Sequence, residues 1–239
     1  MIKIISIKKD TKRYLVTIDC GNEISHYKIS EDLLIEMRFL SPKEITESNY
    51  NLFLSRLPED AILLEGIKYL DKRIHSEKEV KEHLLNITSS IPLIDKIIIK
   101  LKNKRLLNDE YYKDAIVSNM LNDRRDGKNL IIQKLKEKGL DTSFEYPKEV
   151  LRDNIKYLTI KFNEKENKEP RKSKIEKCKF FLLRKGYTEF DISEYFDSSL
   201  ITVLDEDKLK ALEYQKLMTK YDNDIERVRI ELLKKGFKE

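Results

Sequence analysis

The chain has 239 residues, of which 38% are charged and 40% are hydrophobic. An ordinary globular domain carries about 25% charged residues, so this composition favours an extended helical protein over a compact enzyme. It includes only 6 Gly and 5 Pro, which disfavours an all-β fold with many tight turns. No apolar run approaches the ~20 residues of a membrane span, and the N-terminus is too soon charged for a signal peptide. We therefore expect a cytoplasmic protein without membrane contact.

The net charge is +5, and it is unevenly distributed. Residues 161–185 hold ten Lys or Arg against four Asp or Glu, so the rest of the chain is close to neutral. A local basic segment suggests contact with a polyanion or an acidic protein face, although a solvated linker and helix face would have the same composition. Cys20 and Cys178 are far apart in sequence, as is typical of free thiols in a reducing compartment.

The first 58 residues differ from the remainder. Alternating apolar residues predict strands over 2–8, 14–18 and 24–29, separated by turns. Ser30 is a candidate cap for a helix over 31–39, and residues 43–58 have a second helical pattern that we expect Pro58 to end. A sheet of three strands is marginal alone, so we expect this domain to cap one end of the following helices.

Helical periodicity dominates from Glu59 onward. Ser76 and Glu79 have the spacing of a capping box, which places a helix start at Ser76. Three apolar stripes predict three short helices around this start. The first stripe is Ile62, Leu63, Gly66, Ile67 and Leu70; the second is Val80, Leu84 and Ile87; the third is Ile94, Ile97, Ile98, Leu101 and Leu106.

A short pattern then recurs. Gly139, Gly186 and Gly236 each follow a lysine and precede an apolar residue, and they are 47 and 50 residues apart. Each glycine is expected to end a helix in the left-handed conformation while the following apolar residue packs back. An apolar residue stands eight positions before each glycine, and Val80 has the same place before Thr88 in an earlier copy. A period near 50 residues predicts tandem helical repeats that bury their stripes by stacking.

The predicted fold is therefore mainly α: tandem three-helix repeats in an elongated curved array, preceded by a small β-rich domain of three strands and a helix. Residues 163–173 are polar and are expected to form a link within the third copy. The last copy ends after its glycine and holds two helices, over about 207–221 and 223–236. The predicted divisions are an N-terminal cap over 1–58, repeats over 59–108, 109–156 and 157–206, and a partial repeat over 207–239.

Sequence signals of catalysis are missing. The chain has no Gly-rich phosphate loop, and no Cys or third His accompanies His75 and His83 at a metal-binding spacing. The carboxylates have the spacing of helix-surface ion pairs, as Glu77 has with Lys81. We therefore expect no enzyme, no catalytic residue, no metal, no cofactor and no small-molecule substrate.

Basic residues recur at helix ends. Arg73 ends the first helix of one copy, and Arg124 and Arg125 lie at the equivalent place in the next. Such arginines can compensate the helix dipole, or they can line a basic track for a protein filament or nucleic acid. Phe180, Phe181 and Tyr187 lie near the basic segment, where base stacking is one reading and core packing is the one their helical spacing favours.

Four segments carry a resemblance to a known family. They are Tyr69-Leu70-x-x-Arg73-x-x-Ser76-Glu77-x-Glu79-Val80-x-x-x-Leu84, Leu106-Leu107-Asn108-Asp109-x-x-Tyr112, Gly127 with Leu135-x-x-Lys138-Gly139-Leu140, and Arg184-Lys185-Gly186-Tyr187. In their order and spacing they resemble the RecX family of recombination regulators, over about residues 60–239.

The resemblance implies a non-enzymatic partner of the RecA filament on single-stranded DNA. Family members lie in the filament groove or cap its growing end, and they lower ATPase, strand exchange and co-protease activity, restraining homologous recombination, DNA repair and the SOS response. We expect a monomer that touches single-stranded DNA indirectly or weakly. The expected contacts are Arg73, Lys81, Arg124, Arg125, Lys128, Arg171, Lys172, Lys174 and Arg184. Direct binding of nucleic acid by the helical repeats, or service as a scaffold for another protein, remain the alternatives.

Overall fold

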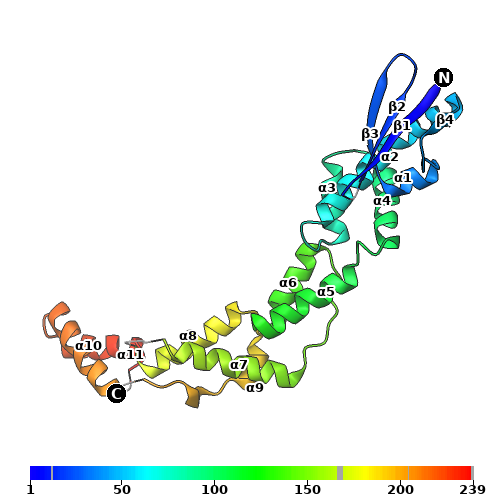
Figure 1. The fold of residues 1–239 in the computed structure, drawn as a ribbon. Helices are drawn as coiled ribbons and strands as arrows, with labels where there is room; N and C mark the ends of the chain where they lie inside the picture. The colour runs from blue at the N-terminus through cyan, green and yellow to red at the C-terminus, as the bar shows by residue number, and fades with distance from the viewer. Residues whose placement is uncertain (12, 166–168, 204, 238–239) are drawn as a thin grey trace. The chain divides into compact units, whose positions relative to one another are not determined.

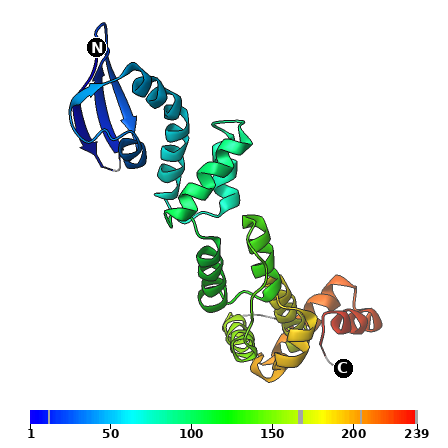
Figure 2. The same ribbon diagram turned by 90° about the vertical axis from the view of Figure 1, so that its right-hand side faces the viewer.

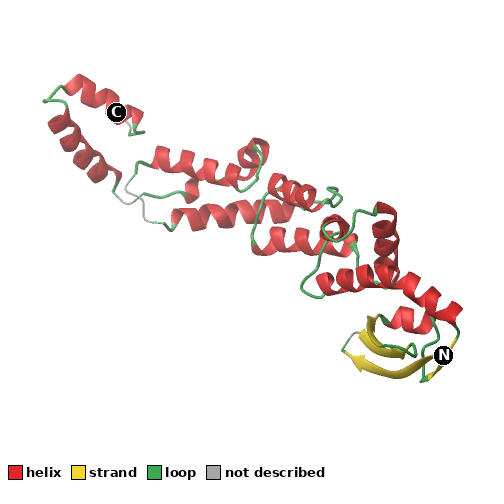
Figure 3. Cartoon of the chain, turned by 90° about the horizontal axis from the view of Figure 1, so that it is seen from above, coloured by secondary structure: helices red, strands yellow, loops and turns green. Residues whose placement is uncertain are grey.

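Strands are confined to the N-terminal part of the chain, and helices form the rest (Figures 1 and 3). The computed structural model describes residues 1–11, 13–165, 169–203 and 205–237. Contacts divide the chain into two units, one of residues 1–112 with 138–140 and one of residues 113–137 with 141–239. The mainly α fold with a small β-rich N-terminal domain is confirmed.

The N-terminal sheet is antiparallel and has the order β3-β2-β1-β4. Its strands are β1 (Ile2–Asp10), β2 (Arg13–Asp19), β3 (Ile24–Ile29) and β4 (Lys43–Ile45) (Figure 2). Three strands were predicted, and the prediction missed β4. Three residues are too few to show an alternating pattern, and β4 is fixed instead by pairing with the start of β1, where Ile45 lies opposite Ile2.

One face of the sheet is buried under α1 (Glu31–Glu36) and α2 (Glu47–Leu70). Ser30 caps α1 as predicted, accepting a hydrogen bond from the Leu33 N–H. The Ser30 N–H and hydroxyl both donate to the carboxylate of Asp60, a buried residue of α2. Burial raises the pKa of Asp60 against the opposing effect of these hydrogen bonds. The cap thereby also joins α1 to α2.

Helix α2 runs without interruption through Pro58, so the prediction of a helix end there is wrong. A proline in a helix removes one backbone hydrogen bond, which is a local cost. Packing on both sides offsets it: Phe53, before the proline, is fully buried in the sheet core, and Leu63, after it, is buried in the next cluster. Tertiary burial of the two halves therefore overrides the local signal.

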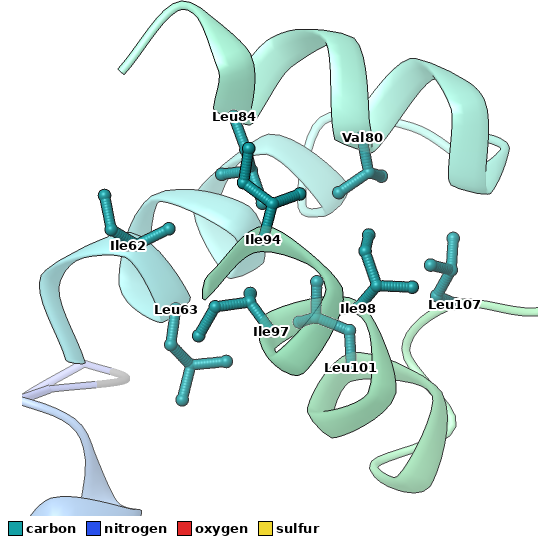
Figure 4. Close-up of a cluster of buried hydrophobic side chains, with 9 residues drawn as sticks. All are labelled: Ile62, Leu63, Val80, Leu84, Ile94, Ile97, Ile98, Leu101 and Leu107. Carbon is teal, nitrogen blue, oxygen red and sulfur yellow. The ribbon is translucent and has the colours of Figure 1, made fainter. Parts of the chain in front are cut away.

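The second half of α2 packs with α3 (Glu77–Leu85) and α4 (Ile91–Asn103). Figure 4 shows their shared core: Ile62, Leu63, Val80, Leu84, Ile94, Ile97, Ile98, Leu101 and Leu107. Two predicted stripe residues are corrected. Ile87 lies beyond the end of α3 and is 46% exposed, and Leu106 is 45% exposed because the chain turns after α4 and buries Leu107 instead.

The remaining helices follow in sequence. They are α5 (Asp109–Ser118), the π-helix η1 (Asn119–Asp123), α6 (Lys128–Lys138), α7 (Lys148–Asn163), α8 (Arg171–Arg184), α9 (Glu189–Tyr195), the 3-10 turn η2 (Ser198–Leu200), α10 (Glu206–Lys220) and α11 (Ile225–Lys234). The two helices predicted for the last copy are confirmed as α10 and α11. The predicted link over 163–173 is longer than the gap between α7 and α8, because residues 171–173 already belong to α8; its residues 166–168 lie outside the described residues.

The repeated glycines are in the left-handed conformation, as predicted, with φ of +69°, +89° and +96° for Gly139, Gly186 and Gly236. Each also lies against an earlier helix start, which the sequence did not reveal. A Cβ on Gly186 would lie 2.7 Å from the Leu130 N atom, and a Cβ on Gly127 would lie 2.3 Å from the Gly186 carbonyl carbon. Gly186 is therefore required by close backbone approach as well as by conformation, and Gly127 by close backbone approach.

The division into repeats stays a proposal about the sequence pattern. Helices α2 and α7 run through the predicted boundaries at 58/59 and 156/157, and residues 141–147 between α6 and α7 form no helix. None of the helices in the described part of the chain is long and apolar enough to cross a membrane.

Candidate partner-binding surfaces

Arg73, the first of the predicted contact residues, belongs to an ion cluster around Glu79. Its Nη2 lies 2.9 Å from Glu79 Oε1, and Lys138 Nζ lies 2.6 Å from the same oxygen. The other oxygen of Glu79 accepts the Ser76 N–H at 3.0 Å, which completes the predicted capping box. Half of the Arg73 side chain stays exposed. Arg73 therefore has a structural partner and an exposed portion that a second molecule can reach.

The electrostatics of this cluster favour the ionised carboxylate. Burial of Glu79 on its own would raise its pKa, but hydrogen bonds from Arg73, Lys138 and the Ser76 N–H outweigh burial and lower the pKa to about 2. His75 is buried beside the cluster and stacks on Tyr69, with 3.9 Å between ring centroids. Burial lowers the pKa of His75, followed by the nearby charge of Arg73. The described residues contain no group of three or more His, Cys, Asp or Glu arranged to hold a metal ion.

Lys81 lies on α3 and is engaged by two carboxylates. Its Nζ is 2.9 Å from Glu77 and 3.0 Å from Asp95, and the side chain is 38% exposed. The hydrogen bond to Glu77, followed by that to Asp95, raises the pKa of Lys81. The predicted pairing of Glu77 with Lys81 is present within α3, and the contact of Lys81 with Asp95 ties α3 to α4.

Arg124 belongs to a second ion cluster, in which the central carboxylate is Asp126. Arg124 Nε lies 2.8 Å from Asp126 Oδ2, and Lys185 Nζ lies 3.0 Å from Oδ1. Lys185 also donates to the Arg124 carbonyl at 3.1 Å. The Asp126 side chain is 1% exposed whereas that of Arg124 is 55% exposed. As with Arg73, one arginine joins a structural ion pair and remains accessible.

Arg125 is held more tightly than its neighbour. Its backbone is in the left-handed conformation, with φ of +54°, and its carbonyl accepts the Tyr187 hydroxyl at 2.8 Å. The guanidinium donates to Asn154 Oδ1 at 2.8 Å and lies 4.0 Å from the centroid of the Tyr157 ring. Tyr157 is itself 42% exposed. Arg125 and Tyr157 thus form a preorganised cation–π pair at the surface of the second unit.

Two of the predicted contact residues, one buried and one partly buried, donate hydrogen bonds to backbone carbonyls of the same unit. Lys174 is 4% exposed, and its ammonium donates to the carbonyls of Asn163 and Thr202 at 3.1 and 3.0 Å. Arg171 donates to the carbonyls of Ile201 and Ser198 at 2.9 and 2.7 Å. Both side chains hold the segment after α9 against α8. The sequence placed them in a basic surface because burial of a cation by carbonyl acceptors leaves no sequence signal.

Three predicted contact residues are exposed, and their charged groups have no partner within the described part of the chain. Lys128 begins α6, Lys172 lies in the first turn of α8, and Arg184 ends α8. Within the described ranges none of the three has an ion pair or hydrogen bond. Their charges are therefore available to a partner without disruption of the fold.

Sequence reasoning missed residues that complete these surfaces. Lys138 and Lys185 precede the repeated glycines and were not among the predicted contacts, whereas each reaches a carboxylate 59 residues earlier in the chain. The recurrence of Lys before Gly was the signal that could have found them. Three aromatic residues were considered for base stacking. Tyr187 is buried, and Phe181 packs against Phe162 with 5.5 Å between ring centroids, so both residues contribute to packing within the fold. Phe180 is 64% exposed.

The described residues thus form a mainly helical protein in which some cations are paired near helix ends and others are exposed. No family model matches the chain. "Regulatory protein RecX" of Oceanobacillus iheyensis is 26% identical to it, over 92% of this chain and 84% of that protein. "Regulatory protein RecX" of Streptococcus mutans serotype c is 28% identical, over 99% of this chain and 95% of that protein.

Solved structures share the fold. The crystal structure of a regulatory protein RecX has a TM-score of 0.61 at 21% identity, and covers 81% of this chain and 98% of that one. RecX from Lactobacillus salivarius has a TM-score of 0.53 at 24% identity, over 57% of this chain and 93% of that one. Together, the sequence relatives and the shared fold support a RecX family protein.

Proposed function

We propose that this protein is a negative regulator of the RecA recombinase, acting from the cytoplasm as a monomer. It binds along the RecA filament on single-stranded DNA or caps its end, and it thereby inhibits ATP hydrolysis, strand exchange and co-protease activity. By this route it restrains homologous recombination and the SOS response. It needs no catalytic residue and no cofactor for this role.

The observation that carries the proposal is the extent of the sequence match. Relatives named as regulatory proteins align over 92% and 99% of this chain, so the β-rich domain and the helices are both included. A regulatory protein acts through the surface that contacts its partner, and the exposed cations provide charged groups for such a surface. Lys128, Lys172 and Arg184 are the free contacts, and the exposed parts of Arg73, Lys81, Arg124 and Arg125 add to them. Arg171 and Lys174 are left out because their charges are used internally.

The test is a titration of the protein into RecA on single-stranded DNA while ATP hydrolysis is followed. We expect hydrolysis to fall progressively and to reach a low plateau at amounts below or near that of RecA. Hydrolysis that is unchanged at a several-fold excess over RecA would overturn the proposal.

A second candidate is direct binding of nucleic acid by the helices, favoured by the uncommitted charges of Lys128 and Lys172. Binding to single-stranded DNA in the absence of RecA, weakened steeply by added salt, would support it. Binding that requires RecA would favour the first proposal.

A further inference from the structure

An exposed aromatic ridge lies on α8, away from the ion clusters. Phe180 is 64% exposed, although its neighbour Phe181 is partly buried against Phe162. Hollows of about 650 and 480 Å³ lie in the surface on either side, and Phe180 and Leu183 line both. A ring exposed to this extent is unfavourable in water, and contact with a partner would remove that exposure. We call Phe180, Leu183 and the two hollows the Phe180 surface.

The larger hollow is lined, among the described residues, by Phe162, Lys177, Phe180, Leu183 and Arg184, so the charged side chains of this lining are two cations. Helix α8 carries six basic residues and one acidic residue. Lys177 is paired with Glu169, whereas Arg184 has no ion pair among the described residues. An apolar floor beside a free guanidinium is complementary to an apolar side chain that is followed or preceded by a carboxylate.

The smaller hollow distinguishes a protein ligand from a nucleic acid. Its lining includes two carboxylates, Glu176 and Glu189, together with Lys179. These carboxylates would repel the phosphates of a strand whose base stacked on Phe180. The Lys179 ammonium lies 5.5 Å from the centroid of the Phe196 ring, so it is directed to an aromatic of its own chain. The two hollows beside the Phe180 ring can each accept a side chain, whereas a stacked base would need one open face of the ring.

We propose that the Phe180 surface receives a segment of a protein partner, which places one apolar side chain in each hollow and a single carboxylate on Arg184, on the side away from Glu176 and Glu189. This inference rests on the proposed function, since it takes the partner to be the RecA filament. It assigns the apolar anchor of that contact to α8, in addition to the cations already named. Aromatic and arginine side chains at the centre of an interface contribute most to its affinity.

The test measures binding of the full chain to RecA filaments assembled on single-stranded DNA. Phe180→Ala is expected to weaken binding at least tenfold, and Arg184→Glu by a similar factor. Phe190→Ala is the matched control, because Phe190 is also exposed, at 71%, and lines neither hollow. Its binding is expected to stay within twofold of wild type, and thermal unfolding should match wild type for all three variants.

The outcomes separate the two proposals. If wild type binds filaments and both Phe180→Ala and Arg184→Glu bind equally well, the inference is wrong and the proposed function stands. If wild type fails to bind filaments, the proposed function is wrong and the partner assigned to the Phe180 surface is wrong with it. If Phe180→Ala instead loses affinity for an oligothymidine strand alone and keeps its affinity for filaments, the surface binds nucleic acid and the inference is overturned.

Discussion

Lys185 Nζ lies 3.0 Å from the buried carboxylate of Asp126, 59 residues earlier in the chain. The same separation of 59 residues relates Lys138 to Glu79. In both cases the lysine precedes a left-handed glycine, and an arginine a few residues before the carboxylate in the chain binds the same carboxylate. The period of the sequence is therefore expressed as a recurring Arg–carboxylate–Lys contact, in which the lysine comes from a later helix end than the arginine and the carboxylate.

Removal of the Asp126 carboxylate should destabilise the second unit. Asp126→Ala leaves Arg124 and Lys185 close together without their counter-charge, and the cost of breaking such a buried pair is about 3 kcal/mol. Urea unfolding followed by far-UV circular dichroism measures it. Asp153→Ala is the control, because that side chain is 67% exposed and its loss should cost less than about 1 kcal/mol. Equal stability of both variants would contradict the role given to Asp126.

Comparison of Gly186 with Gly236 separates the cost of an unfavourable backbone conformation from the cost of a steric clash. Both have positive φ, but a Cβ on Gly186 would lie 2.7 Å from the Leu130 N atom, whereas a Cβ on Gly236 would find its nearest neighbour at an ordinary 3.4 Å. Gly236→Ala should cost about 1 kcal/mol from conformation alone. Gly186→Ala should cost at least about 2 kcal/mol more, since the backbone must shift. Similar losses in thermal unfolding would show that close approach contributes little.

The elements predicted correctly are those whose cause is local. The capping box of Ser76 and Glu79 and the glycine helix ends involve residues within one turn, so their spacing carries the information. Pro58 shows the opposite case, because its local signal for a helix end is overridden by burial of distant contacts on both sides.

The candidate surface was less predictable for the same reason. Sequence identifies a cation but does not tell whether its partner is solvent, a carboxylate or a carbonyl. Lys172 and Lys174 are two positions apart on α8, yet the first is exposed and the second is 4% exposed against two backbone carbonyls. Those acceptors come from separate segments that the fold alone brings together.

The pKa of Glu79 predicts a pH-dependent stability. Its pKa is about 2 in the folded chain against an ordinary value of 4.5, so its contribution is complete above pH 4.5 and is lost as the pH falls from 4.5 towards 2. The contribution is on the order of 2 kcal/mol, with the side chain 13% exposed. Glu79→Gln should therefore be less stable than wild type at neutral pH, and the difference should shrink near pH 3. Glu82→Gln, at a 62% exposed position of the same helix, should show no such trend.

Lys174 and Lys172 make a matched pair for the buried cation. Lys174→Met leaves the carbonyls of Asn163 and Thr202 without their donor and should destabilise the chain by about 1–3 kcal/mol. Lys172→Met removes an exposed charge and should change stability by less than about 0.5 kcal/mol. Thermal unfolding of the two variants checks the difference. A larger loss of stability for Lys172→Met than for Lys174→Met would contradict the structural role given to Lys174.

Charge reversal at the uncommitted cations should weaken regulation without loss of structure. The double variant Lys128→Glu with Lys172→Glu should raise the concentration needed for half-inhibition of RecA ATP hydrolysis about tenfold, at unchanged helical content. Lys136→Glu, an exposed position on α6 outside the proposed contacts, is the control. Equal inhibition by the double variant and wild type would show that Lys128 and Lys172 do not contribute to the contact with RecA.

The central claim is that this protein binds the RecA filament, and co-sedimentation tests it most directly. The protein is mixed with RecA assembled on single-stranded DNA, or with the DNA alone, at physiological salt, and the pellet is assayed. We predict saturable recovery of the protein in the pellet with the filaments and little recovery with DNA alone. Protein that stays in the supernatant at every filament concentration would contradict the account.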